Sequence, residues 1–279
     1  MSVEVLVAAM NIPPNGLLTF ASQMRLDSNA IVINQCDRVD EEWVEEKSHS
    51  IRMVSFPERG VGRSRNEAIM RSKESICLFS DQDIVYEEGY DKRIELEFQA
   101  YPQIDMILFQ VEVCAQRKTY HNTRHKRVRR FNCGRYPTYC FAIRRDSLLK
   151  SRVFFSLLFG GGAPYSNGED SLFIRDLIKK GIRVMTSPIC IAREESQGQS
   201  TWFQGYHQRF FYDRGVLYHF LYGKLAKIFA WRFLLAHKET MCVSIEPKQA
   251  YRYMKAGMKH AKNRGKHPEY RDEHLQAQE

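Results

Sequence analysis

Short apolar runs alternate with more polar stretches over the first hundred residues of the chain. The runs at 3–9, 30–34, 75–80 and 105–109 have the length and composition of buried strands. The first three are separated by stretches long enough for a helix or a short additional strand. This spacing predicts βαβ units and a mainly parallel sheet.

Helices are expected between these runs, at 16–27, 62–73 and 88–100. In the last of them Ile94 and Phe98 recur at helical spacing, so one face of that helix can pack against the sheet. The first hundred residues therefore have the pattern of a nucleotide-binding half.

The second hundred residues continue the α/β pattern. Strands are expected at 138–144 and 182–186, and a helix at 170–180 that ends before Gly181. Ahead of them, residues 117–130 carry seven fixed positive charges and no acid. We expect this segment to be an exposed loop, because such a run of cations does not pack in a core.

After Trp202 the pattern becomes helical almost to the end of the chain. We therefore predict an α/β domain over 1–200, with a nucleotide-binding half at 1–110 and a second half at 111–200. A basic helical C-terminal region at 201–279 follows it.

Composition and charge limit the possible classes of protein. With 279 residues, of which 43% are apolar, the chain can bury a large core, which excludes intrinsic disorder as its main state. The formal charge of +9 is concentrated after residue 199, where 14 Lys and Arg stand against 7 Asp and Glu. Such a surface attracts anionic lipid, nucleic acid or a phosphorylated acceptor alike, so charge does not choose among them.

The N-terminal run and the cysteines favour a cytoplasmic location. Glu4 interrupts the apolar run and no basic stretch precedes it, which argues against a signal peptide. The 7 cysteines are scattered without a C-x-x-C pair, so they indicate neither a disulfide framework nor a zinc site.

The first motif with candidate chemistry is Asp81-Gln82-Asp83, which follows the strand at 75–80. In an extended chain Asp81 and Asp83 project to the same side, at the sheet edge where α/β proteins bind ligands. Their carboxylates suit Mg²⁺ or Mn²⁺ shared with a substrate diphosphate. The alternative is that both acids cap the next helix or lie in a solvated turn.

The second motif is Glu169-Asp170, at the start of a predicted helix. The glycine-rich segment before it includes Gly161 and Gly162, which permit a mobile loop beside a substrate. Acids are also favoured in the first turn of any helix, so the pair alone does not establish a site.

The third motif places Arg63 and Arg65 in the first turn of a predicted helix, after the turn at Gly60. The helix dipole disfavours cations there. The two arginines therefore need an anionic partner, and a diphosphate is one.

In this order and on this background, the motifs resemble those of bacterial family 2 glycosyltransferases, which have the GT-A fold. The resemblance extends over about the first 215 residues. Within the family, the chain is similar in particular to enzymes of capsular and exopolysaccharide assembly. The segments that carry it are the N-terminal strand, Ile33–Asp37, Ser64–Asn66, Asp81–Asp83, Glu169–Asp170 and Ser200–Trp202.

The resemblance implies a hexosyl transfer that inverts the anomeric centre. The donor would be a nucleotide-sugar, and a UDP-sugar is expected. The acceptor would be a glycan or a lipid-diphosphate-linked glycan. Asp170 would be the catalytic base with Glu169 beside it, and Asp83 with Asp81 would hold Mn²⁺ or Mg²⁺.

The resemblance also assigns the binding residues. Donor contacts fall on Met10, Asn11, Asn34, Gln35, Arg63, Arg65 and Asp81. The resemblance makes 1–200 the catalytic domain, with 111–200 as its acceptor half. Acceptor contacts fall on Gly161, Gly162 and Trp202. Two positions depart from the family pattern: Gln82 stands where many relatives have a third acid, and Asn34 where many have an Asp that reads uracil.

Residues 216–236 are apolar, but Lys224, Lys227 and Arg232 in their interior argue against a membrane span. An interfacial helix fits this composition, which would attach the protein peripherally to the inner face of the cell membrane. A core or oligomer-interface helix with snorkelling Lys and Arg is the alternative.

A different class is a basic nucleic-acid-binding protein, which the pI of about 9.2 would suit. No RNA- or DNA-binding motif is present, so we expect no nucleic-acid partner. An inactive GT-A-like scaffold is a further alternative.

Overall fold

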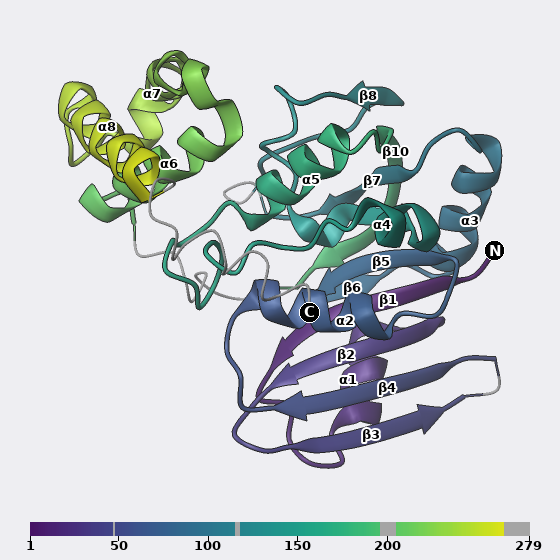
Figure 1. Cartoon of the computed structure of the whole chain (residues 1–279). Coiled ribbons are helices and arrows are strands. Elements are labelled where there is room, and N and C mark those ends of the chain that lie inside the picture. The colour runs from purple at the N-terminus through teal and green to yellow at the C-terminus, as the bar shows by residue number, and fades with distance from the viewer. Residues whose placement is uncertain (47, 115–117, 196–204, 265–279) are drawn as a thin grey trace. The chain divides into compact units, whose positions relative to one another are not determined.

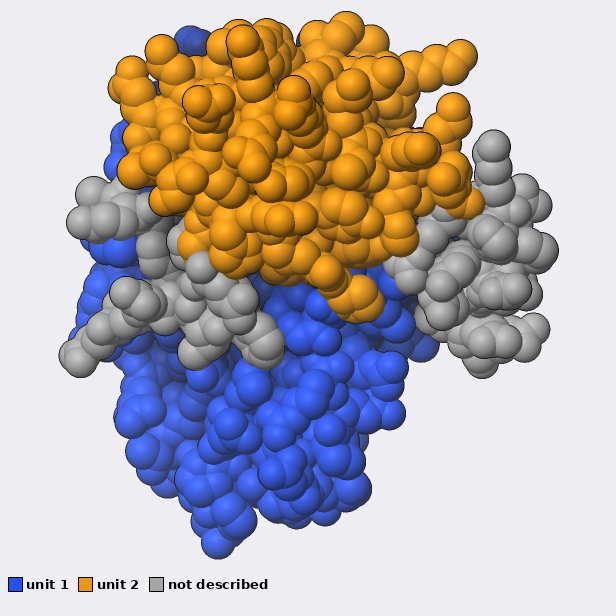
Figure 2. All heavy atoms as spheres, turned by 90° about the vertical axis from the view of Figure 1, so that its left-hand side faces the viewer, with its two compact units in different colours: residues 1–163, 169–199 blue, residues 164–168, 200–279 orange. Residues whose placement is uncertain are grey.

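The computed structural model describes residues 1–46, 48–114, 118–195 and 205–264 (Figure 1). The chain divides into two compact units, shown in different colours in Figure 2. The first comprises residues 1–163 and 169–199, and the second residues 164–168 and 200–279. The predicted division of the first two hundred residues into a nucleotide-binding and an acceptor half stays a prediction.

The first unit is built on one mixed sheet. Among the described residues its order is β3-β4-β2-β1-β5-β9-β7-β10-β6, and β8 pairs with β10. The strands are β1 (Val3–Met10), β2 (Asn29–Gln35), β3 (Asp40–Glu45), β4 (Ser50–Phe56), β5 (Ile76–Asp81), β6 (Ile84–Tyr86), β7 (Met106–Glu112), β8 (Lys126–Val128), β9 (Phe141–Arg144) and β10 (Val184–Glu194). Strands β1, β2, β4, β5, β7 and β10 run in one direction, and the others run against them.

Helices flank this sheet, with α1 and α2 on opposite faces (Figure 1). The helices of the first unit are α1 (Leu17–Met24), α2 (Val61–Arg71), α3 (Tyr90–Ala100), α4 (Arg145–Ser151) and α5 (Glu169–Lys179). Strands β1, β5 and β7 are covered on both sides, and for that reason they read as nearly continuous apolar runs. The predicted fold class, a mainly parallel α/β sheet flanked by helices with appended C-terminal helices, is confirmed.

Two local predictions need correction. The segment 138–144 is a strand only from Phe141, because residues 138–140 form a short 3-10 helix. The stretch between β2 and α2 holds two strands, β3 and β4, of which β3 is an exposed edge strand with four acids. Its low apolar content hid it from the strand pattern.

The expectation that 117–130 forms an exposed loop is wrong for part of the segment. Tyr120 is buried, and its hydroxyl donates to the carbonyl of Phe109 and accepts from the amide of Val111. Strand β8 pairs with β10 and buries Val128. The cations of β8 remain exposed while its apolar residue packs inward, as the alternation of a strand allows.

The second unit is helical, with α6 (Gln208–Tyr222), the 3-10 turn η2 (Gly223–Leu225), α7 (Ala226–Met241) and α8 (Pro247–Arg264). Helices α6 and α8 cross at two glycines. A Cβ at Gly215 would clash with the carbonyl oxygen of Met254, and one at Gly257 with that of Tyr212. The two backbones can approach this closely only because both positions lack a side chain.

The segment 216–236 is not one helix. It breaks at Gly223, whose φ of 54° ends α6, and α7 starts three residues later. Val216, Leu217 and Leu221 are buried, so the part that belongs to α6 packs as core. None of the helices in the described part of the chain has both the length and the apolar character that a membrane span requires.

Candidate active site

One buried arginine joins the three motifs of the sequence. Arg65 lies in α2, Asp81 ends β5, and Glu169 begins α5. Nη2 of Arg65 donates to Oδ1 of Asp81 over 2.8 Å, and Nη1 donates to Oε1 of Glu169 over 3.0 Å. Only 5% of the Arg65 side chain is exposed. Motifs distant in the sequence therefore meet at a single guanidinium.

An aromatic layer supports this arginine. The ring of Phe155 lies 5.4 Å from the guanidinium carbon, and it stacks on Phe173 of α5 with ring centroids 3.9 Å apart. Burial opposes the charge of Arg65, but the carboxylates of Asp81 and Glu169 outweigh it and raise the pKa of the guanidinium. The arginine is therefore a fixed positive charge beneath the carboxylates.

Asp170 follows Glu169 in the first turn of α5. Burial, helped by the nearby charge of Glu169, raises the pKa of Asp170 to about 7. The amide of Ser171, which donates to Oδ1 of Asp170 over 2.6 Å, and the charge of Arg65 oppose this rise. A carboxyl group that exchanges its proton near neutral pH has the property required of a general base.

The glycine-rich segment before α5 packs against the start of α2. The amide of Val61 donates to the carbonyl of Gly161 over 3.0 Å. Gly160 has a φ of +107°, and a Cβ there would lie 2.8 Å from Cδ of Glu169. The segment thus passes directly beside Glu169. The predicted acceptor contacts of Gly161 and Gly162 stay predictions.

The carboxyl ends of β1, β2 and β5 lie at the same edge of the sheet as these groups and are joined by side-chain hydrogen bonds. Oε1 of Gln82 accepts from the amide of Met10 over 2.7 Å, and Oε1 of Gln35 accepts from the amide of Gly60 over 2.7 Å. The amide of Asn11 donates to the carbonyl of Gln35. Hydrogen bonds thus connect three predicted donor residues and Gln82 along this edge of the sheet. The donor residues are Met10, Asn11 and Gln35.

Asn34, near the end of β2, hydrogen-bonds to the segment that follows β1. Its side chain is fully buried, and its Oδ1 accepts from the amide of Ile12 over 3.0 Å. Its Nδ2 donates to the carbonyl of Ile12 and to Oγ of Ser55, each over 3.0 Å. Asn34 therefore holds the segment after β1, and both its amide oxygen and its amide nitrogen are hydrogen-bonded within the chain.

Asp81 and Asp83 are not arranged as an extended chain would place them. Strand β5 ends at Asp81, residues 82–83 form a turn, and β6 begins at Ile84. Asp81 turns one carboxylate oxygen to Arg65, and its side chain is 33% exposed. The assumption that both side chains continue the alternation of the strand was therefore wrong.

The donor set at this turn still suits a hard divalent cation. In the described residues no cluster of three or more His, Cys, Asp or Glu side chains could enclose a metal ion. Mg²⁺ and Mn²⁺ are commonly held by one or two carboxylates together with substrate phosphates. Asp81, whose side chain is 33% exposed, has the chemistry for that mode of binding, and the assignment of Asp83 stays a prediction.

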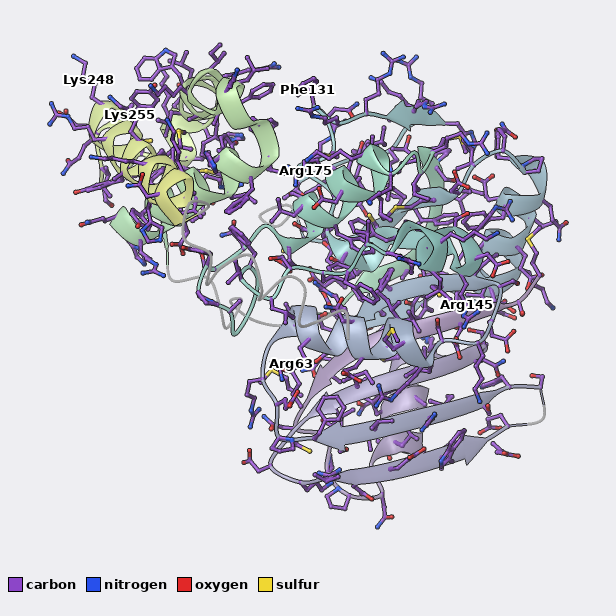
Figure 3. The ribbon with its side chains drawn as sticks, in the orientation of Figure 1. Arg63, Phe131, Arg145, Arg175, Lys248 and Lys255 are labelled. Atoms are coloured by element: carbon purple, nitrogen blue, oxygen red, sulfur yellow. The ribbon has the colours of Figure 1, made fainter. Side chains whose placement is uncertain are left out.

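One predicted donor residue, Arg63, forms its ion pair outside this cluster. Arg63, labelled in Figure 3, is exposed and pairs with Glu58. Carboxylates of the chain itself thus provide the anionic partners of both Arg63 and Arg65. Trp202 lies outside the described residues.

Sequence reasoning missed the roles of Gln82 and Phe155. Gln82 was noted only as a missing acid, whereas its side chain fastens the turn of Asp81 and Asp83 to the end of β1. An uncharged amide between two acids is a usable signal for such a link, because it accepts a hydrogen bond without adding charge. No sequence signal distinguishes Phe155 from its neighbouring aromatic residues.

Neither a protein-family model nor a curated protein matches the chain. Solved structures do. S. aureus TarS 1-349 in complex with UDP-GlcNAc superposes with a TM-score of 0.59 at 12% identity, covering 88% of this chain and 74% of that one. The complex of the same TarS fragment with UDP gives a TM-score of 0.55 at 12% identity over the same shares.

A mannosyltransferase from Pyrobaculum calidifontis, in complex with GDP-Man and Mn²⁺, is more distant. It gives a TM-score of 0.49 at 14% identity, covering 99% of this chain and 79% of that one. At the identity with TarS, the similarity is one of fold: the chain is folded like TarS 1-349 over most of its length.

Proposed function

We propose that the chain is a glycosyltransferase that moves a sugar from a nucleoside-diphosphate donor to a hydroxyl of an acceptor. The observation that carries this proposal is the junction of Arg65, Asp81 and Glu169 beside Asp170, at the carboxyl edge of the sheet. A base poised near neutral pH stands next to carboxylates that suit a metal–diphosphate complex. The similarity of fold to TarS, which was crystallised with UDP-GlcNAc, supports the same class of donor.

In the proposed mechanism Asp170 removes the proton of the acceptor hydroxyl as its oxygen bonds to the anomeric carbon. The bond from that carbon to the diphosphate oxygen breaks, and the nucleoside diphosphate leaves with the electron pair. A single displacement of this kind inverts the anomeric centre. Arg65 keeps Glu169 and Asp81 in place throughout, because it is buried and holds both.

Asp83 and Asp81 would hold the divalent cation, Mn²⁺ or Mg²⁺. When bound, the cation offsets the charge that develops on the departing diphosphate. Met10, Asn11 and Gln35 would line the nucleotide site from the ends of β1 and β2, with Asn34 positioning them.

The finer assignments rest on the resemblance to bacterial family 2 enzymes. They are a UDP-sugar donor, a glycan or lipid-diphosphate-linked glycan acceptor, and a role in surface polysaccharide assembly at the inner face of the cell membrane. Within this proposal the acceptor contacts are Gly161, Gly162 and Trp202.

Thermal unfolding with a panel of nucleotides and sugar nucleotides, each with Mn²⁺ and with EDTA, tests the donor site. A ligand at 100 times its Kd stabilises the folded state by roughly 2.7 kcal/mol. We expect one sugar nucleotide to raise the midpoint only with the metal, and Asp83→Ala to abolish that rise. Release of nucleoside diphosphate in the presence of an acceptor then measures transfer.

The same panel can refute the proposal. If no sugar nucleotide protects the protein while nucleic acid binds with steep salt dependence, the chain is a nucleic-acid-binding protein. If neither ligand binds, the fold serves as an inactive scaffold.

A further inference from the structure

Helix α7 of the second unit exposes a row of large apolar side chains. The helix packs on its unit through Ala226, Ala230 and Leu234, which are buried. The exposed row consists of Leu225, the N-cap residue of α7, and of Ile228, Trp231 and Leu235 within the helix; their exposed fractions are 42%, 66%, 41% and 56%. Their spacing of three or four residues places them on one face of the helix, so the row is a continuous surface and not scattered apolar residues.

Cations accompany this row on η2, on α7 and on the neighbouring helix α8. Lys224, Lys227 and Arg232 are exposed beside the row. On α8, Lys248, Arg252 and Lys255 are exposed at positions i, i+4 and i+7, which share one helix face. The 18 residues of α8 contain no Asp or Glu, so no acid on that helix neutralises these charges.

The row and the cations of α8 meet at a hollow. Trp231 of α7 packs edge-on against Tyr251 of α8, with ring centroids 5.3 Å apart. The hollow beside this pair has a volume of about 440 Å³, and its lining contains two aromatic residues, three cations and no acid. Two of the cations, Lys248 and Lys255, are labelled on α8 in Figure 3. The lining is Trp231, Lys248, Tyr251, Arg252 and Lys255.

We propose that this α7–α8 surface, defined by the apolar row and the cations named above, docks on the anionic face of a lipid bilayer. The apolar row enters the boundary between headgroups and acyl chains, and the cations contact lipid phosphates. Trp231 lies where both parts meet, which suits an indole ring at a membrane interface. The proposal does not depend on the transferase activity, because it concerns the second unit alone.

Other occupants fit the surface less well. A soluble phosphorylated ligand would use the cations but leave the apolar row in water. In a symmetric pair of this chain, the same cations would face each other and repel. A lipid surface matches both halves at once, because it offers anionic headgroups above an apolar layer.

Flotation of the full chain with vesicles of phosphatidylcholine, with and without phosphatidylglycerol, tests the proposal. We expect binding to the anionic vesicles, weaker binding to the neutral ones, and loss of binding at high salt. The variant Lys248→Gln/Arg252→Gln/Lys255→Gln should bind anionic vesicles about 100-fold less tightly, because each cation near the surface contributes roughly one factor of five.

The apolar half is tested by Ile228→Ser/Leu235→Ser, which should lower binding at least about tenfold. Matched controls come from exposed positions of the first unit. Lys92→Gln/Lys150→Gln/Lys180→Gln removes as many charges, and Leu18→Ser/Leu96→Ser removes as many apolar side chains. Both controls should float as the parent protein does.

Absence of binding to anionic vesicles would overturn the proposal, as would equal binding by the triple-cation variant and its control. A parent protein that is dimeric in solution and becomes monomeric in Ile228→Ser/Leu235→Ser would instead make the row a self-association surface. If that apolar variant does not fold, the cation variant and the salt dependence still decide. The vesicles contain no nucleotide, so failure here leaves donor binding unaffected.

Discussion

The guanidinium of Arg65 donates to the carboxylate of Glu169 over 3.0 Å, across 104 residues of sequence. This contact fixes the first turn of α5 against α2 and compensates the charge of Glu169. Asp170, the next residue, has no such ion pair with Arg65 among the described contacts, and its pKa rises to about 7. Two adjacent carboxyl groups thus have different surroundings, because Glu169 is held by the guanidinium while burial raises the pKa of Asp170.

Replacing Arg65 by methionine should strongly destabilise the protein. Arg65→Met removes the guanidinium that pairs with Asp81 and Glu169, and breaking a buried ion pair costs about 3–5 kcal/mol. Urea unfolding measures the loss. Arg63→Met is the matched control, because Arg63 is exposed on the same helix and its ion pair should contribute at most about 1 kcal/mol. Equal stabilities of the two variants would contradict the buried pair.

Asp170→Asn should lower turnover by about 100- to 10,000-fold and leave donor affinity nearly unchanged, because a general base acts in the chemical step. Steady-state turnover and donor binding by calorimetry separate the two effects. Asp176→Asn, on the exposed part of the same helix, serves as the control and should retain activity. A turnover close to that of the parent protein would remove Asp170 from this role.

The rate should rise with pH through about 7, because Asp170 must lose its proton before it can accept one from the acceptor. Turnover at saturating donor, measured across this range at constant metal concentration, reports the ionisation. A profile that is flat between pH 6 and pH 8, roughly one unit on each side of that pKa, would show that another group is the base.

The same ionisation affects stability with a defined sign. The folded-state pKa of Asp170 is raised from 3.8 to about 7, so its favourable contribution is fully present below 3.8 and is lost as the pH rises through about 7. Asp170→Asn should therefore be more stable than the parent protein above pH 7, on the order of a few kcal/mol, and gain nothing in acid. Urea unfolding at both extremes measures this, and a destabilised variant at high pH would contradict it.

The sheet could be predicted because its central strands are covered on both faces. Val5, Leu78 and Ile107 lie in strands whose side chains are buried on both faces of the sheet. Such strands appear in the sequence as continuous apolar runs. Strand β3 and strand β8 were missed for the opposite reason. Each strand has an exposed face with charged residues, such as Glu41 and Lys126, so neither strand forms a continuous apolar run.

The sequence singles out Arg65, Asp81 and Glu169, which meet at one junction, but it does not predict their geometry. Only Asp81 is expected at the carboxyl edge of the sheet, whereas Arg65 and Glu169 are expected in the first turns of separate helices. The sequence could not show that Arg65 pairs with these two acids. It also could not show that the side chain of Asn34 hydrogen-bonds to the backbone of Ile12. Both contacts depend on side-chain packing between segments that are distant in the chain, which local patterns do not contain.

A methyl group at Gly160 should disturb Glu169 and with it the site. A φ of +107° is strained for any residue other than glycine. The new Cβ would also lie 2.8 Å from Cδ of Glu169 and 2.8 Å from Cγ1 of Val61. We expect Gly160→Ala to cost about 1–3 kcal/mol and to lower turnover as well. Gly89→Ala is the control, since Gly89 also has a positive φ, of +68°, but nothing lies within 4 Å of its Cβ position. That variant should lose about 1 kcal/mol of stability and keep its activity, because strain alone is added there. If Gly160→Ala lost no more stability or turnover than Gly89→Ala, the close approach of the glycine segment to Glu169 would be wrong.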